Sequence, residues 1–173
     1  MEGLAAQLHN FHYLLSPYAP ALVLTASFFD ILFLTGFLLY GGALVASILM
    51  LYGSGAIGAE ALFISAYMGT FLGNCTNFLI GKYFGEYEFV KRKLQTKTMK
   101  KVQRFTHNHG LFICMAIGRF VTFIRPVYAL VLGTTGLSPR RFFLYESMIA
   151  FIWIAFWVVV IVQGDMLLER LPR

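Results

Sequence analysis

The sequence predicts an all-α integral membrane protein, a small helical bundle with two opposed re-entrant hairpins related as an inverted repeat. The first observation is composition: 58% of the 173 residues are hydrophobic and 13% are charged, against ~45–50% and ~25% in soluble domains. The others are four long apolar runs and the charges near the middle of two of them. Because a spanning helix needs ~20 apolar residues, about four or five membrane segments fit into this length.

The apolar runs cover residues 18–52, 56–80, 111–135 and 142–162. The first run is too long for one crossing, since a helix of that length would measure roughly 50 Å against a hydrocarbon core of ~30 Å. It must therefore bend or re-enter, and Asp30 and Gly36 lie where a bend is expected.

Segment 82–110 separates the second and third runs and holds eight of the fourteen Lys and Arg residues. Short loops rich in Lys and Arg stay on the cytoplasmic side of a membrane, so we expect segment 82–110 to be cytoplasmic. Its apolar residues recur at roughly helical spacing, which favours a helix lying on an anionic membrane surface. Nucleic-acid binding is a poor explanation for these charges, because no soluble domain accompanies them.

The third run leaves the cytoplasmic segment and reaches another basic pair, Arg140 and Arg141, about thirty residues later. A simple crossing would place that pair outside, whereas a turn near Arg125 and Pro126 returns the chain to the favoured side. A residue before proline is disfavoured in helices, which supports a break there. Two broken hairpins in corresponding halves are typical of inverted-repeat transporters with a site near the membrane midplane.

Three ionisable side chains, Asp30, Arg119 and Arg125, lie within these two long runs. Each charge near a helix centre opposes insertion by roughly 2.5–3.5 kcal/mol, so together they cost up to ~10 kcal/mol unless they are paired or hydrated. We expect the arginines to bind an anionic headgroup and Asp30 to accept a proton or pair with an arginine between transport steps. An ion pair between Asp30 and an arginine that merely locks the hairpins is the structural alternative.

Further polar residues are candidates for lining a cavity: Asn74 and Asn77, three residues apart on one helix face, and Glu146 near the start of the last run. The GxxxG motifs at residues 69–73 and 81–85 are better explained by close helix packing. No catalytic set, dinucleotide or nucleotide-binding motif is visible, so we expect no enzyme, cofactor or metal site. Cys75 and Cys114 are interpreted as small apolar residues.

We divide the chain into an N-terminal interfacial segment (1–17), one membrane domain (18–168) containing the basic segment, and a tail (169–173). Residues 1–17 lack the features of a signal peptide. The expected location is the plasma (inner) membrane, as a multi-pass protein.

Over residues 25–165 the chain resembles the DedA or VTT-domain (SNARE-associated Golgi) membrane proteins. Their Arg-Phe-x-Pro-x-x-Arg stretch is similar to residues 119–125, which keep both arginines and their spacing, and it is followed here by Gly133, Phe142 and Trp153. The family element Gly-Asp-Asn-x-x-Tyr-x-x-Gly-Arg resembles residues 73–82. His109 and Gly110 are similar to the phrase that precedes the arginines.

The chain departs from the family pattern at four positions. Asp30 stands for a glutamate, Phe37 for a second acid, Asn74 for an aspartate and Thr122 for a proline. If a proton-coupled cycle needs two carboxylates, the second would have to be another residue, such as Glu60 or Glu146.

The resemblance implies movement of undecaprenyl phosphate or phospholipid between leaflets, on opposed re-entrant hairpins. We therefore expect a flippase or scramblase of an anionic lipid, with protons as a second partner if the cycle is coupled and a homo-oligomer left open. The alternatives are a proton- or ion-coupled transporter of a small solute using Asp30, and a non-transporting scaffold that binds lipid through the basic segment.

Overall fold

The computed structural model describes residues 16–32, 42–85, 87–88, 104–108, 110–120 and 125–170, and the regular elements in these ranges are all helical. In chain order they are η1 (Ser16–Tyr18), α2 (Ala19–Ile31), α4 (Gly42–Gly53), α5 (Ala59–Phe84), α8 (Leu111–Phe120), α9 (Arg125–Thr134) and α10 (Pro139–Arg170). The predicted all-α class is confirmed. Most of the basic segment 82–110 lies outside the described residues, as does Gly36.

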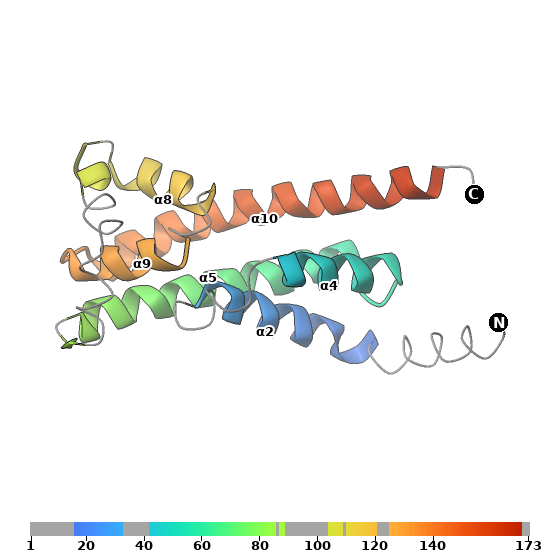
Figure 1. Ribbon diagram of the computed structural model, residues 1–173, viewed down its shortest axis with the longest axis horizontal. Helices are drawn as coiled ribbons and strands as arrows, with labels where there is room; N and C mark the ends of the chain where they lie inside the picture. The colour runs from blue at the N-terminus through green and yellow to red at the C-terminus, as the bar shows by residue number, and fades with distance from the viewer. Residues whose placement is uncertain are drawn as a thin grey trace.

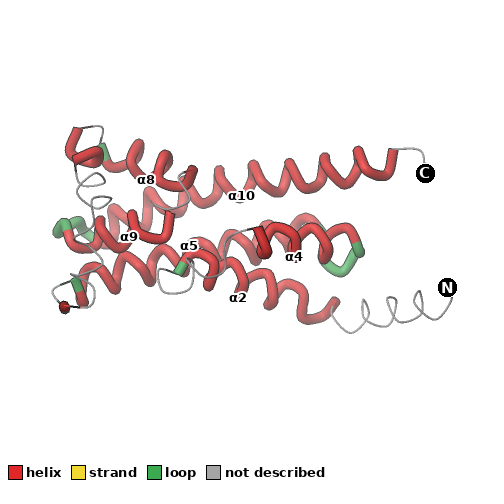
Figure 2. Tube along the Cα trace, in the orientation of Figure 1, coloured by secondary structure: helices red, strands yellow, loops and turns green. Residues whose placement is uncertain are grey.

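Two long helices, α5 and α10, run along the bundle, and two pairs of shorter helices accompany them (Figure 1). Helices α2 and α4 run in opposite directions, and so do α8 and α9. The two pairs enter from opposite ends of the bundle, and Figure 2 shows how short the described loops between the helices are. These pairs correspond to the two runs predicted to break; their re-entry into a membrane and their relation as an inverted repeat stay predictions.

The helix ends lie close to the predicted interruptions, with one difference at Arg125 and Pro126. Helix α2 ends at Ile31, directly after Asp30, and α4 ends where Ser54 and Gly55 form a turn with Gly55 at φ 73°. Arg125 and Pro126 begin α9 instead of forming the turn before it. Proline is tolerated there because the amide groups of a first helical turn have no partner within the helix.

Both glycine motifs on α5 lie where another helix touches its backbone. A Cβ atom on Gly69 or Gly73 would collide with α2, at the Leu24 carbonyl oxygen and the Ile31 side chain respectively. A Cβ on Gly81 would collide with the Leu130 carbonyl oxygen of α9. The packing interpretation of these motifs is confirmed, and α5 thereby packs closely against one helix of each short pair.

Two clusters of buried side chains fill the bundle. One surrounds Phe78, Tyr128 and Phe142, with the Phe78 and Phe142 rings stacked at a centroid distance of 4.2 Å. The other joins Ala19 and Val23 of α2 to Leu62 of α5. The first cluster includes Tyr128, whose hydroxyl belongs to the group of polar residues described below.

Within the described ranges, one helical stretch, Pro139–Gly164 of α10, is long and apolar enough to cross a membrane. Several large apolar side chains along this helix are exposed, namely Leu144, Met148, Phe151, Ile152, Phe156 and Val159. Such a continuous apolar surface is unusual on a soluble monomer and is typical of a helix in contact with lipid. The expected four or five crossings are not established by these helices.

Candidate functional site

A cluster of four polar side chains lies inside the bundle, each from a different helix: Asn74 of α5, Arg119 of α8, Tyr128 of α9 and Glu146 of α10. Asn74, Tyr128 and Glu146 are fully buried, and Arg119 is 3% exposed. Because each comes from a different helix, helix packing brings the four together.

The carboxylate of Glu146 is the centre of this cluster. Its Oε1 accepts hydrogen bonds from Asn74 Nδ2 at 2.7 Å and from Arg119 Nη2, with which it forms a buried ion pair. Its Oε2 accepts a hydrogen bond from the Tyr128 hydroxyl at 2.9 Å, and Asn74 Nδ2 also donates to that hydroxyl at 2.8 Å. Removing one member of such a pair leaves an uncompensated buried charge, which typically costs about 3–5 kcal/mol, so losing either Arg119 or Glu146 would disfavour the packing of α8 against α10.

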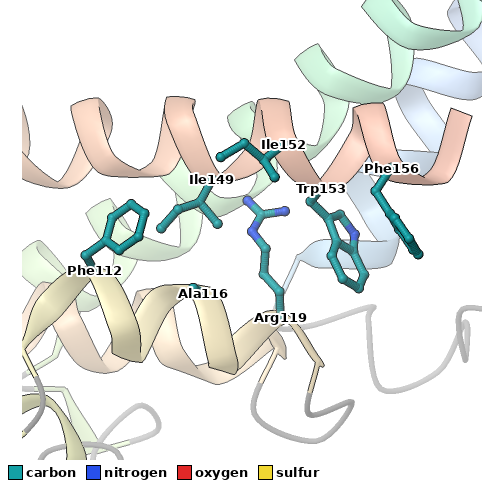
Figure 3. A pocket seen from close by; sticks show the side chains of 7 residues that line it. All are labelled: Phe112, Ala116, Arg119, Ile149, Ile152, Trp153 and Phe156. Carbon is teal, nitrogen blue, oxygen red and sulfur yellow. The ribbon is translucent and has the colours of Figure 1, made fainter. Parts of the chain in front are cut away.

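Arg119 also lines a pocket of about 370 Å³ between α8 and α10 (Figure 3). Its guanidinium group points from α8 toward α10, beside Ile149, Ile152 and Trp153. The other lining residues are Phe112, Ala116 and Phe156, so the walls are apolar. Arg119 Nε and Nη1 are buried and have no hydrogen-bond partner among the described residues. This pocket therefore combines an apolar wall with one cation that has donor capacity left over.

The other predicted site residues are only partly brought to this cluster. Asn77 is buried on α5 and donates through Nδ2 to the Ile31 carbonyl oxygen at 2.8 Å, which ties α5 to the end of α2 beside Asp30. Asp30 itself is buried at that helix end. Arg119 pairs with Glu146, and not with Asp30 as the alternative of a purely structural ion pair expected. Arg125 begins α9, but its side chain lies outside the described part of the structure.

Tyr128 was not among the residues selected from the sequence, although it donates to Glu146 and accepts from Asn74. A signal was present, because a buried tyrosine hydroxyl needs a hydrogen-bond partner. Tyr128 lies in a run of small and aliphatic residues two positions after Pro126. Periodicity alone could not distinguish it from a core aromatic residue.

The VTT domain family matches residues 35–163 of the chain. Similar proteins include the membrane protein BU139 of Buchnera aphidicola, 31% identical over 134 residues that make up 76% of this chain and 52% of that protein. The inner membrane protein YabI of Escherichia coli is 26% identical over 81% of this chain and 56% of its own length. The inner membrane protein YghB of Salmonella typhimurium is 29% identical over 95% and 76%.

No solved structure matches the chain significantly. The chain spans about half the length of the first two relatives it matches, which are both from Buchnera aphidicola. The family match covers most of the chain and includes Asn74, Arg119, Tyr128 and Glu146. The resemblance seen in the arginine-containing stretch is therefore confirmed, and the chain belongs to the VTT-domain (DedA) family of membrane proteins.

Proposed function

We propose that this protein moves an anionic lipid between the two leaflets of a membrane, as a flippase or scramblase. The observation that carries the proposal is the position of Arg119. Its guanidinium is almost fully buried, two of its nitrogens have no hydrogen-bond partner among the described residues, and it lines an apolar pocket. A phosphate group and an attached hydrocarbon chain match those two surfaces, since arginine binds phosphate through charge-assisted hydrogen bonds.

The composition of the pocket favours a lipid over a small hydrophilic solute. Ile149, Ile152 and Phe156 offer no hydrogen-bonding side-chain groups to a polar solute, whereas they can contact an acyl or isoprenoid chain. Ile152 and Phe156 are also more than half exposed on the apolar surface of α10, so the pocket borders the surface that would meet the bilayer. A lipid could then enter sideways without leaving the membrane.

In this proposal the lipid is undecaprenyl phosphate or a phospholipid, and Arg125 and Asp30 complete the headgroup path. The chain crosses the inner membrane several times, the pairs α2/α4 and α8/α9 are re-entrant hairpins, and segment 82–110 is cytoplasmic. The opposite directions of entry of the two helix pairs support this arrangement. The buried carboxamide of Asn77 also supports it. This group donates a hydrogen bond to the Ile31 carbonyl oxygen at the end of α2, and a backbone group left without a partner in lipid would be costly.

The test is translocation of fluorescent anionic lipid in liposomes that contain the purified protein. We expect Arg119→Gln and Arg125→Gln to insert normally and to lose most translocation. Arg140→Gln and Arg141→Gln are matched controls, because they remove the same charge from exposed positions at the start of α10. Translocation that is unchanged in both Arg119 and Arg125 variants would refute the proposal.

The same liposomes separate the alternatives. A small-solute transporter would show flux driven by a pH gradient with no lipid movement. A scaffold would lose its activity when the charges of segment 82–110 are removed and keep it when Arg119 is replaced.

A further inference from the structure

We propose that Glu146 is a built-in competitor for the lipid headgroup: its carboxylate occupies the anion-binding donors of the bundle until an incoming anion displaces it. The inference rests on the proposed function and concerns how the same site is controlled. Three observations support it, and each concerns a different part of the cluster.

The first observation is the number and origin of the donors. Arg119, Asn74 and Tyr128 come from three helices and all donate to the two oxygens of Glu146. Two oxygens that accept from a guanidinium, an amide and a hydroxyl present the same acceptor chemistry as two oxygens of a phosphate diester. The three donors therefore form an anion-binding site, and in this structure the anion that they bind is the carboxylate of Glu146.

The second observation is that Glu146 uses only part of Arg119. Nη2 donates to the carboxylate, while Nε and Nη1 have no hydrogen-bond partner among the described residues. The same guanidinium lines the pocket between α8 and α10. These two nitrogens are buried beside the pocket, so an anion in the pocket can reach them once the side chains that cover them shift. Arg119 can then bind the anion before Glu146 has left, and the exchange does not require a bare buried cation.

The third observation is the charge balance. The cluster has one cation, Arg119, and one carboxylate, Glu146, so a second anion would leave it with net negative charge inside an apolar environment. Loss of the Glu146 charge, by protonation or by substitution, removes that penalty. The titratable groups that face Glu146 in the described part of the bundle are Arg119 from α8, Tyr128 from α9 and Cys75 from α5.

The experiment uses Trp153 as a reporter, because it lines the pocket and the chain has only two tryptophans. In a Trp157→Phe background, quenching or shift of Trp153 fluorescence is followed while dihexanoyl phosphatidylglycerol is added to protein in neutral detergent. Its phosphate diester keeps one negative charge across the pH range used. Dihexanoyl phosphatidylcholine, which has the same chains and no net charge, is the control ligand.

We expect Glu146→Gln to bind phosphatidylglycerol at least about tenfold more tightly than the parent, and phosphatidylcholine equally. The parent should bind phosphatidylglycerol more tightly at pH 5 than at pH 8, because protonation of Glu146 removes the competing charge, and Glu146→Gln should lose that dependence. The double variant Asn74→Asp with Glu146→Gln returns a carboxylate to the cluster from α5. It should restore weak, pH-dependent binding.

Equal binding by the parent and a folded Glu146→Gln variant would overturn the inference. So would a parent whose binding does not change with pH, a measurement that needs no substitution at Glu146. Arg119→Gln separates the two proposals. If Arg119→Gln abolishes phosphatidylglycerol binding while Glu146→Gln leaves it unchanged, only the proposal that Glu146 competes with the headgroup fails. If Arg119→Gln binds as the parent does, the proposed function fails as well.

Discussion

Gly81 of α5 lies directly against the backbone of Leu130 in α9, so closely that no side chain fits between the two helices. The contact is backbone on backbone, and it lies one helical turn before the end of α5. It fixes the distance between α5 and α9, the two helices that supply Asn74 and Tyr128 to the polar cluster.

Replacing Gly81 by alanine should therefore destabilise the protein. The added methyl group meets the Leu130 carbonyl oxygen, which cannot rotate away, and overpacking of this kind costs about 1–3 kcal/mol. The midpoint of thermal unfolding in detergent measures this loss of stability. Gly164→Ala is the matched control: this glycine is also in a helix interior, but a Cβ there would meet nothing within 4 Å, so we expect no loss of stability. Equal midpoints for the two variants would contradict this account of the packing.

Asn77→Leu should destabilise the junction of α5 and α2. The variant keeps a similar volume but removes the amide that donates to the Ile31 carbonyl oxygen, and an unsatisfied buried group costs about 1–3 kcal/mol. Hydrogen exchange of the α2 amides should accelerate. Thr76→Val is the neighbouring control, because the Thr76 hydroxyl donates to the Leu72 carbonyl oxygen of its own helix. Acceleration in that variant too would argue against a specific role for Asn77.

Tyr128→Phe tests the hydroxyl that joins Asn74 to Glu146. The ring stays in the core, but Glu146 Oε2 loses a donor and Asn74 loses an acceptor, so we expect about 1–3 kcal/mol of destabilisation. Denaturation in detergent, followed by circular dichroism, measures the change. Tyr83→Phe removes a hydroxyl from a side chain that is 65% exposed and should have little effect. A stable Tyr128→Phe protein would show that the hydroxyl contributes little to the cluster.

Filling the pocket should block lipid without unfolding the bundle. Ala116→Phe places a ring in the space beside Arg119, so we expect weaker binding of phosphatidylglycerol and slower translocation in liposomes. Ile117→Phe adds an aromatic ring at the next position of α8, on an exposed surface that does not line the pocket. Similar losses in both variants would indicate a general effect on α8.

The helical class and the breaks in two long apolar runs could be predicted from the sequence, because hydrophobic length and proline position act locally. The close packing at Gly69, Gly73 and Gly81 was also predictable, because glycines four residues apart lie on one helix face and leave it without side chains. The partner of Arg119 was not. Asp30 and Glu146 are both carboxylates in apolar surroundings, and only the tertiary arrangement of α5, α8 and α10 decides which one meets the arginine.

The missed Tyr128 has the same cause. A tyrosine at a core position reads as an apolar ring until the structure shows that its hydroxyl faces Asn74 and Glu146. Glu146 was selected only as a candidate for lining a cavity. It lies near the start of an apolar run, where a charged side chain can stay at the membrane surface at little energetic cost. Its full burial follows from the three donors that surround it.

The glycines of α5 have a consequence for how the two short helix pairs depend on one another. Gly69 and Gly73, in the middle of α5, hold α2 close to it, and Gly81, near its end, holds α9 close to it. A side chain added at any of these three positions would push one short helix away from α5. One helix thereby sets the spacing of both pairs, while the stacked rings of Phe78 and Phe142 join it to α10.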